Sequence, residues 1–131
     1  MKKVVVFCLL SVLPFALASI VLGETTLSVE TAAIATGVEN LTPIGVGEKF
    51  PATIGRVYCY SKILGGSEGN SVKHIWYYGD KKVSEMSLSV KYSSFRTYSY
   101  KTIPSNWTGK WRLEIVSDDG TILKTLEFNV E

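Results

Sequence analysis

The feature that most constrains the fold of this chain is the alternation of large aromatic residues with polar ones between residues 74 and 111. The segments 74–78, 95–101 and 107–111 carry eight of the chain's Phe, Tyr and Trp side chains, and the last two segments separate them with Thr, Ser, Arg, Gly and Lys. A repeat of two residues is typical of a β-strand with one buried face. Val, Ile, Thr, Tyr and Trp, which are frequent here, are the residues enriched in strands. The sequence therefore predicts an all-β fold.

We expect about seven strands, because alternating segments recur with turn residues between them. The expected ranges are 27–36, 54–63, 71–79, 82–91, 95–102, 110–117 and 121–130. Gly79-Asp80 suits a tight type II′ hairpin, and Asp118-Asp119-Gly120 suits a hairpin with positive φ at Gly120. In the last strand Leu123 interrupts the parity of the apolar residues, so we expect a bulge near Thr125 or burial on both sides. Seven short antiparallel strands indicate an immunoglobulin-like β-sandwich.

The first 23 residues have the pattern of a secretory signal peptide. Lys2 and Lys3 precede an apolar run, and Ala16-Leu17-Ala18 offers a cleavage site after residue 18, with a second one after residue 23. In the rival interpretation the run 4–22 is retained as an anchor, because it could just cross a bilayer core about 30 Å thick. Either way we expect the folded part to leave the cytoplasm, as a periplasmic or secreted domain or as one anchored to the inner membrane.

Residues 24–49 contain no Phe, Tyr or Trp. We therefore expect them to form an N-terminal strand and linker, at the edge of the fold and outside its core, and residues 50–131 to form the core of the sandwich. Cys59 is the only cysteine after the leader and lies in an apolar run, so we expect a buried, structural thiol. Apart from Lys2 and Lys3, the chain holds 12 basic and 12 acidic residues. This balance argues against a nucleic-acid partner and against an anionic membrane surface.

Four groups of residues resemble a known family when they are taken in order along the chain. They are His74-x-Trp76, Phe95-Arg96 with Ser99-x-Lys101, Trp107-Thr108-Gly109-Lys110-Trp111, and Asp119-Gly120 with Leu123 and Phe128. From about residue 40 to residue 130 the chain is similar to a bacterial family of β-rich domains of unknown function, found in exported or membrane-attached proteins. The resemblance implies export and a β-rich fold. It does not indicate an activity, because none is assigned to the family. The family tends to have Trp at the position of Phe95 and a second Ser at that of Tyr100. If these positions line a ligand surface, the ligand of this chain would differ from that of the family, whereas at packing positions the changes would mean little.

The sequence contains no complete catalytic or metal-binding set of residues. Gly65-x-Ser67-x-Gly69 matches a nucleophile-elbow string, but that motif needs a following helix on a large α/β sheet, and a strand is expected here. One histidine and one cysteine do not suffice for zinc. We therefore predict no enzyme activity, no cofactor and no metal.

The candidate binding residues are those whose polar or aromatic groups are embedded in the aromatic segments: His74, Trp76, Arg96, Lys101 and Trp107. The structural interpretation of His74 is a half-buried ring that forms hydrogen bonds across the sandwich beside Trp76. For Arg96 and Lys101 it is a cation–π contact. Trp111 shares its parity with Leu113 and Ile115 and is expected in the core, whereas Trp107 follows a turn and is expected near a loop.

The sequence thus predicts a non-catalytic, exported binding or interaction module of the bacterial cell envelope, with an envelope protein or a glycan as partner. The alternative is a carbohydrate-binding domain, since exposed aromatic rings can stack on sugars. The two differ in whether Trp76, Tyr77, Tyr98 and Trp107 form one exposed patch. We expect the protein to be attached to a membrane only if the leader is retained as an anchor.

Overall fold

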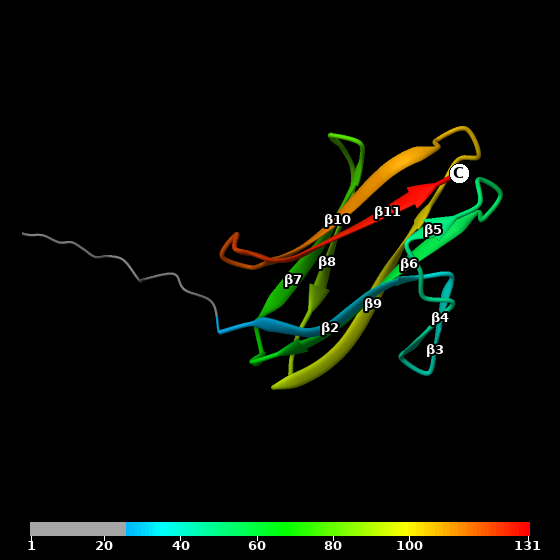
Figure 1. Cartoon of the computed structure of the whole chain (residues 1–131). Coiled ribbons are helices and arrows are strands. Elements are labelled where there is room, and N and C mark those ends of the chain that lie inside the picture. The colour runs from blue at the N-terminus through cyan, green and yellow to red at the C-terminus, as the bar shows by residue number, and fades with distance from the viewer. Residues whose placement is uncertain (1–25) are drawn as a thin grey trace, which may run out of the picture.

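The computed structural model describes residues 26–131, so the predicted signal peptide or anchor lies outside the described residues. Every regular element of this part of the chain is a strand (Figure 1). The strands are β2 (Ser28–Ala35), β3 (Gly37–Glu39), β4 (Thr42–Ile44), β5 (Lys49–Phe50), β6 (Arg56–Leu64), β7 (Ser71–Tyr78), β8 (Lys81–Ser89), β9 (Ser94–Thr102), β10 (Gly109–Ser117) and β11 (Ile122–Val130). The seven long strands match the predicted ranges to within two residues at each end. The all-β prediction is confirmed.

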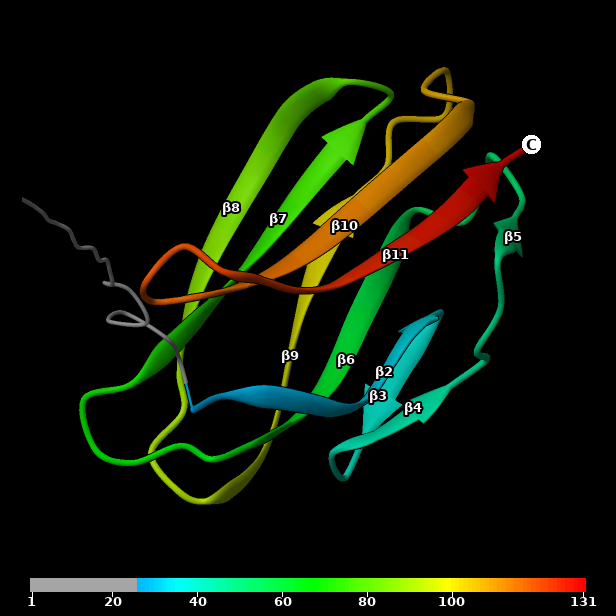
Figure 2. The ribbon, with the colours of Figure 1, turned by 60° about the vertical axis from the view of Figure 1, so that its left-hand side comes forward.

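Two sheets form the two layers of a sandwich. One has five strands in the order β5-β11-β10-β7-β8, and the other has three in the order β2-β6-β9. Figure 2 shows β8, β7, β10 and β11 side by side, with β9, β6 and β2 forming the second layer. The long strands pair in antiparallel fashion, as predicted, whereas the two-residue strand β5 pairs in parallel with the end of β11.

The predicted turns are present, and one irregularity is displaced. Gly79 has φ +59° between the paired residues Tyr78 and Lys81, and Gly120 has φ +92° in the turn before β11. Both conformations are open to glycine because it has no Cβ. The bulge in β11 is at Leu123, because Ile115 pairs with Lys124 while Val116 pairs with Ile122. It therefore lies two residues before the predicted position.

Alternate residues of the long strands fill the space between the sheets. Trp111, Leu113 and Ile115 of β10 are all buried, so the predicted inner face of this strand is confirmed. The prediction for the N-terminal stretch is right in one respect and wrong in another. β2 is an edge strand, but Leu27 and Ile34 are buried in the core cluster. Small aliphatic residues complete the core here, which a count of aromatic residues does not reveal.

The chain between β2 and β6 closes one side of the sandwich. Gly47 N donates to Ile34 O on the edge of β2, and Asn129 N of β11 donates to Glu48 O. The preceding hairpin of β3 and β4 contacts β2 and β6. The part of the chain that the structure describes contains no helix suited to crossing a membrane.

Candidate functional site

A small polar network lies in the core between the two sheets. His74 on β7 has its Nδ1 2.7 Å from Ser99 Oγ on β9 and its Nε2 3.1 Å from Ser61 Oγ on β6. Trp76 Nε1 donates to the same Ser99 oxygen at 3.3 Å. The predicted hydrogen bonding of His74 across the sandwich is confirmed. The ring is fully buried, however, so the prediction of a half-buried ring is wrong.

The network is complete with a neutral imidazole. The indole N–H of Trp76 can only donate, so Ser99 Oγ accepts from it. In either tautomer of His74, one ring nitrogen donates to a serine and the other accepts from a serine. Burial disfavours the charged form and lowers the pKa of His74 to about 4. These contacts hold the two layers in register, and they leave no ring nitrogen open to a substrate from solvent.

Cys59 is also enclosed in the core. Its side chain is fully buried on β6, where its Sγ lies 3.8 Å from Tyr60 O. Burial raises the pKa of the thiol well above its usual range, because the thiolate would lose its hydration. Since the thiolate is the reactive form, this cysteine has the character of a packing residue.

The tryptophans of the 107–111 segment belong to a stack of rings at one end of the core. Trp107 stacks on Tyr78 with ring centroids 5.1 Å apart, and Trp111 stacks on Phe128 at 5.8 Å. Trp111 Nε1 donates to Trp107 O at 3.1 Å, which ties the loop before β10 to the strand. Trp111 is 1% exposed, so its predicted place in the core is confirmed. Trp107 is partly buried in the loop, against this stack.

The structure does not bring the five predicted binding residues together. His74 and Trp76 lie in the core. Arg96 is exposed on the outer face of β9. Lys101 pairs with the buried Val57, so its Cα lies on the inner side of the same strand. Trp107 is partly buried in the loop before β10. The guanidinium groups that stack on rings belong to Arg56 and Arg112, so the cation–π prediction for Arg96 and Lys101 is wrong.

The four aromatic residues proposed as one exposed patch are likewise separated. Trp76 is buried, and Trp107 packs against Tyr78. Tyr77 belongs to the five-stranded sheet and Tyr98 to the three-stranded sheet. An aromatic surface does exist, but it is built from a different set of residues.

Three tyrosines gather on the outer face of the three-stranded sheet, and we call this surface the tyrosine face. Tyr58 on β6 has its ring 5.5 Å from that of Tyr100 and 6.1 Å from that of Tyr98, both on β9. Tyr98 is 40% exposed and Tyr100 is 46% exposed. The strand register explains the cluster, because Tyr58 pairs directly with Tyr100 and the next outward pair is Tyr60 with Tyr98. The alternation within 96–100 indicates an outward row in β9, but the sequence alone does not reveal Tyr58 as its neighbour.

Cationic groups surround the tyrosine face. The guanidinium of Arg56 lies over the Tyr100 ring at 4.1 Å from its centroid. Further along the same face, Lys62 and Arg96 are directly paired across β6 and β9. Neither of these two strands contains Asp or Glu. Glu30 of β2 lies 3.3 Å from Lys62, whereas Arg56 and Arg96 form no ion pair within residues 26–131. The face therefore combines exposed aromatic rings with two guanidinium groups that have no carboxylate partner.

The β3–β4 hairpin borders this face. Arg96 Nη1 donates to Leu41 O at the hairpin tip at 3.4 Å, and β3 contacts β6. Tyr60 is 6% exposed although it lies on the outer face, which is consistent with cover from the hairpin. Asn40 and Leu41 have φ +52° and +56°. A bulky residue such as Leu41 is uncommon in this region, so the tip holds a conformation that its neighbours must stabilise.

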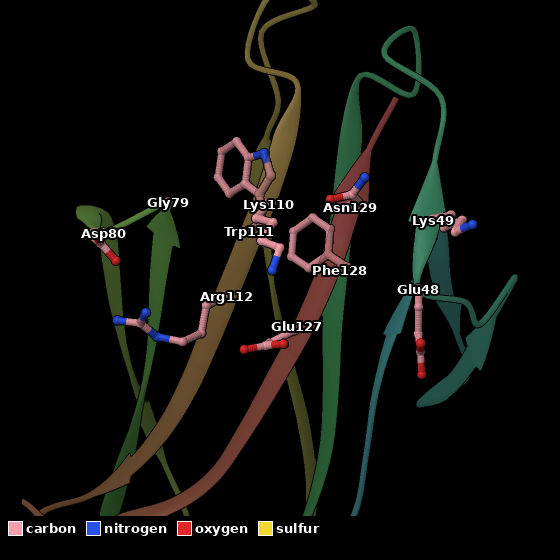
Figure 3. A pocket seen from close by; sticks show the side chains of 10 residues that line it. All are labelled: Glu48, Lys49, Gly79, Asp80, Lys110, Trp111, Arg112, Glu127, Phe128 and Asn129. Carbon is pink, nitrogen blue, oxygen red and sulfur yellow. The ribbon is translucent and has the colours of Figure 1, made fainter.

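The opposite outer face carries a depression of about 380 Å³ (Figure 3). Its lining mixes both signs of charge, with cations from Lys49, Lys110 and Arg112 and carboxylates from Glu48, Asp80 and Glu127. A second depression of about 650 Å³ lies between residues 32–34 of β2 and 124–127 of β11. Neither contains a histidine or a cysteine. Among residues 26–131 no three His, Cys, Asp or Glu side chains are grouped to hold a metal ion.

The loop with the nucleophile-elbow string has a structural role. It joins β6 to β7, so no helix follows Ser67, in agreement with the sequence-based argument. Ser67 Oγ lies 3.0 Å from Asn70 Oδ1, and Asn70 Nδ2 donates to Asp118 Oδ2 at 3.1 Å. These contacts connect the loop to the β10–β11 turn.

The described chain is thus an all-β sandwich that encloses its histidine and cysteine and displays aromatic rings on one outer face. Residues 69–130, which span β7 to β11, match the model of a family described as a protein of unknown function (DUF2914). This part of the chain is similar to that family, over a shorter range than the resemblance that starts near residue 40. No curated protein matches the chain.

Proposed function

We propose that this protein is a non-catalytic, exported binding module of the bacterial cell envelope, and that the tyrosine face is its binding surface. The observation that carries the proposal is that the potentially reactive side chains are buried, whereas aromatic and cationic side chains are exposed on one sheet. The groups best suited to catalysis, His74 and Cys59, are fully buried and internally hydrogen-bonded or packed. By contrast, the exposed rings of Tyr98 and Tyr100 lie with cationic groups on the outer face of the three-stranded sheet.

Export is supported by the pattern of the first 23 residues and by the family resemblance. Lys2-Lys3, the apolar run and Ala16-Leu17-Ala18 follow the order of a signal peptide. Expressed in a bacterial host, the chain should lose its leader and be found in the periplasm. An intact N-terminus in the cytosol, detected by mass spectrometry, would contradict export, whereas an intact N-terminus in the membrane fraction would favour an anchor.

Binding is tested by co-sedimentation of the purified protein with cell-wall and membrane fractions. Wild type should sediment with one of them, and the double variant Tyr98→Thr/Tyr100→Thr should remain in the supernatant. Tyr77→Thr is the matched control, because Tyr77 is a partly exposed tyrosine on the opposite sheet, where Arg112 stacks on it at 4.0 Å. Equal sedimentation of wild type and the double variant would contradict the proposed surface.

A carbohydrate-binding domain is the second candidate, and the tyrosine cluster favours it. Tyrosine rings present an apolar body with a polar tip. Tyr58, Tyr98 and Tyr100 form a contiguous aromatic surface that could stack on sugar rings. A glycan array probed with the purified protein distinguishes this candidate from an interaction module that recognises protein alone.

A further inference from the structure

We propose that the tyrosine face binds a linear polysaccharide that carries carboxylate groups. This inference rests on the proposed function, because it names the ligand of the same surface. Sugar rings would lie on Tyr58, Tyr98 and Tyr100, and their carboxylates would meet Arg56 at one end of the face and Arg96 and Lys62 at the other.

The length of the surface suits a chain-like ligand. Arg96, Tyr98 and Tyr100 are successive outward residues of β9, so the row spans about 13 Å at the rise of an extended strand. Tyr58 widens the row onto β6, with its ring 5.5 Å and 6.1 Å from the two rings on β9. The rings are thus held on a continuous platform by two hydrogen-bonded strands.

The charges of the face point to an acidic ligand. Lys62 and Arg96 are directly opposite each other, an arrangement of like charges that destabilises a sheet. Glu30 reaches Lys62 at 3.3 Å from the neighbouring strand, but within residues 26–131 neither Arg96 nor Arg56 forms an ion pair with a carboxylate. A carboxylate from a ligand would supply the missing partner, and a guanidinium matches its geometry.

The outer face of the five-stranded sheet provides the internal comparison. Its guanidinium has a carboxylate partner, because Arg112 lies 3.4 Å from Glu114. Lys73 and Lys82 share Glu85, and Lys110 forms no ion pair within residues 26–131. Arg56 and Arg96 of the three-stranded sheet therefore differ from Arg112 of the five-stranded sheet in having no carboxylate partner. These two guanidinium groups lie on the sheet where the exposed tyrosines gather.

Neutral glycans and nucleic acids fit the observations less well. A neutral sugar would use the rings but would give neither guanidinium group a carboxylate partner. Single-stranded nucleic acid also combines stacking with charge, but an exported domain does not normally encounter it, and the balanced charge of the chain offers no extended basic surface.

The test is a binding titration of the protein, purified from a bacterial host, with alginate oligosaccharides, dextran oligosaccharides of equal length and single-stranded DNA. We expect binding to alginate that weakens as salt is added, and at least tenfold weaker binding to dextran. Tyr98→Thr/Tyr100→Thr should weaken alginate binding at least tenfold and Arg96→Gln several-fold, while Tyr77→Thr should leave it unchanged.

Three results would overturn the inference. The first is equal affinity for dextran and alginate, and the second is tighter binding of DNA than of alginate. The third is a protein that binds no glycan but still sediments with envelope fractions, and loses that sedimentation in the double tyrosine variant. In the last case the proposed binding module stands and only the ligand class is wrong. If the tyrosine variants change neither glycan binding nor sedimentation, the proposed function itself fails.

Discussion

The two faces of β9 differ in burial and in their contacts, although they alternate residue by residue along one strand. On the inner face Ser99 is buried and joins His74 and Trp76 in the polar network. On the outer face Tyr98 and Tyr100 are exposed beside Tyr58. The polar groups of Ser99 and its neighbours on the inner face are hydrogen-bonded to one another, whereas on the outer face the rings are exposed and Arg96 has no carboxylate partner within residues 26–131. The contrast teaches that the conspicuous His74, Trp76 and Ser99 are buried in the core, whereas the exposed Tyr98 and Tyr100 flank Ser99 along the same strand.

The largest predicted effect is on the inner side of the sandwich, at Trp111. Trp111→Ala should lower the free energy of unfolding by about 3–5 kcal/mol, because it removes a fully buried indole. Trp107→Ala should cost less, roughly 1–3 kcal/mol, because that ring is only partly buried. Chemical denaturation of both variants beside wild type measures the difference. Equal, small losses would contradict the assignment of Trp111 to the core.

The second prediction concerns the pH dependence conferred by His74. Its pKa falls from 6.5 to about 4 on folding, so the unfolded chain binds more protons between these values and stability decreases as the pH falls through them. A tenfold change in proton affinity is worth about 1.4 kcal/mol, so the loss approaches about 3 kcal/mol. Denaturation at pH 7 and at pH 4 should show this loss in wild type and less of it in His74→Gln.

Because His74 is the only histidine, its titration can also be followed directly by NMR. This measurement does not depend on whether the variant folds. A histidine that titrates near pH 6.5 in the folded protein would show that the ring is open to solvent and would contradict the sealed network.

A third, smaller effect is predicted at Cys59. The folded protein should react slowly with a thiol reagent and rapidly once unfolded, because the thiol is fully buried and its pKa is raised. Cys59→Ser should cost about 1–3 kcal/mol, since it buries a hydroxyl in an apolar site. Labelling kinetics in the presence and absence of denaturant provide the test. Rapid labelling of the folded protein would refute the structural assignment.

The smallest predicted effect is on the outer face and has the opposite sign. Arg96→Gln removes one of two like charges that are directly paired with each other, so the free energy of unfolding should rise by about 0.2–0.5 kcal/mol. Low salt should enlarge the gain, because it reduces screening. A loss of more than about 1 kcal/mol would mean that Arg96 is a structural residue, held by its contact with Leu41 O.

Much of the fold follows from local sequence patterns. The period of two residues gives the seven long strands, and Gly79 and Gly120 mark two of their turns. The β3–β4 hairpin was not predicted, because its tip uses Asn40-Leu41 and its second strand contains Pro43, neither of which is typical of a hairpin. The immunoglobulin-like character of the sandwich stays a prediction.

The candidate site was harder to predict than the fold. Tyr58 and Tyr100 become neighbours through the register of β6 and β9, and the β7–β8 hairpin separates these strands in the sequence. The links from His74 to Ser61 and Ser99 cross from one sheet to the other, and no local spacing reveals them. Of the outward residues of β9, Arg96 is among the predicted binding residues and Tyr98 belongs to the aromatic patch considered for carbohydrate binding, whereas Tyr100 is in neither set.

The most direct test of the account is to measure stability and binding together for Tyr98→Thr/Tyr100→Thr. Threonine retains a high strand propensity, so the loss in free energy of unfolding should be at most about 2 kcal/mol, less than that for Trp111→Ala. Binding to the alginate oligosaccharides should fall at least tenfold at the same time. A variant that binds as tightly as wild type, or one that loses stability as severely as Trp111→Ala, would contradict the division of β9 into a folding face and a binding face.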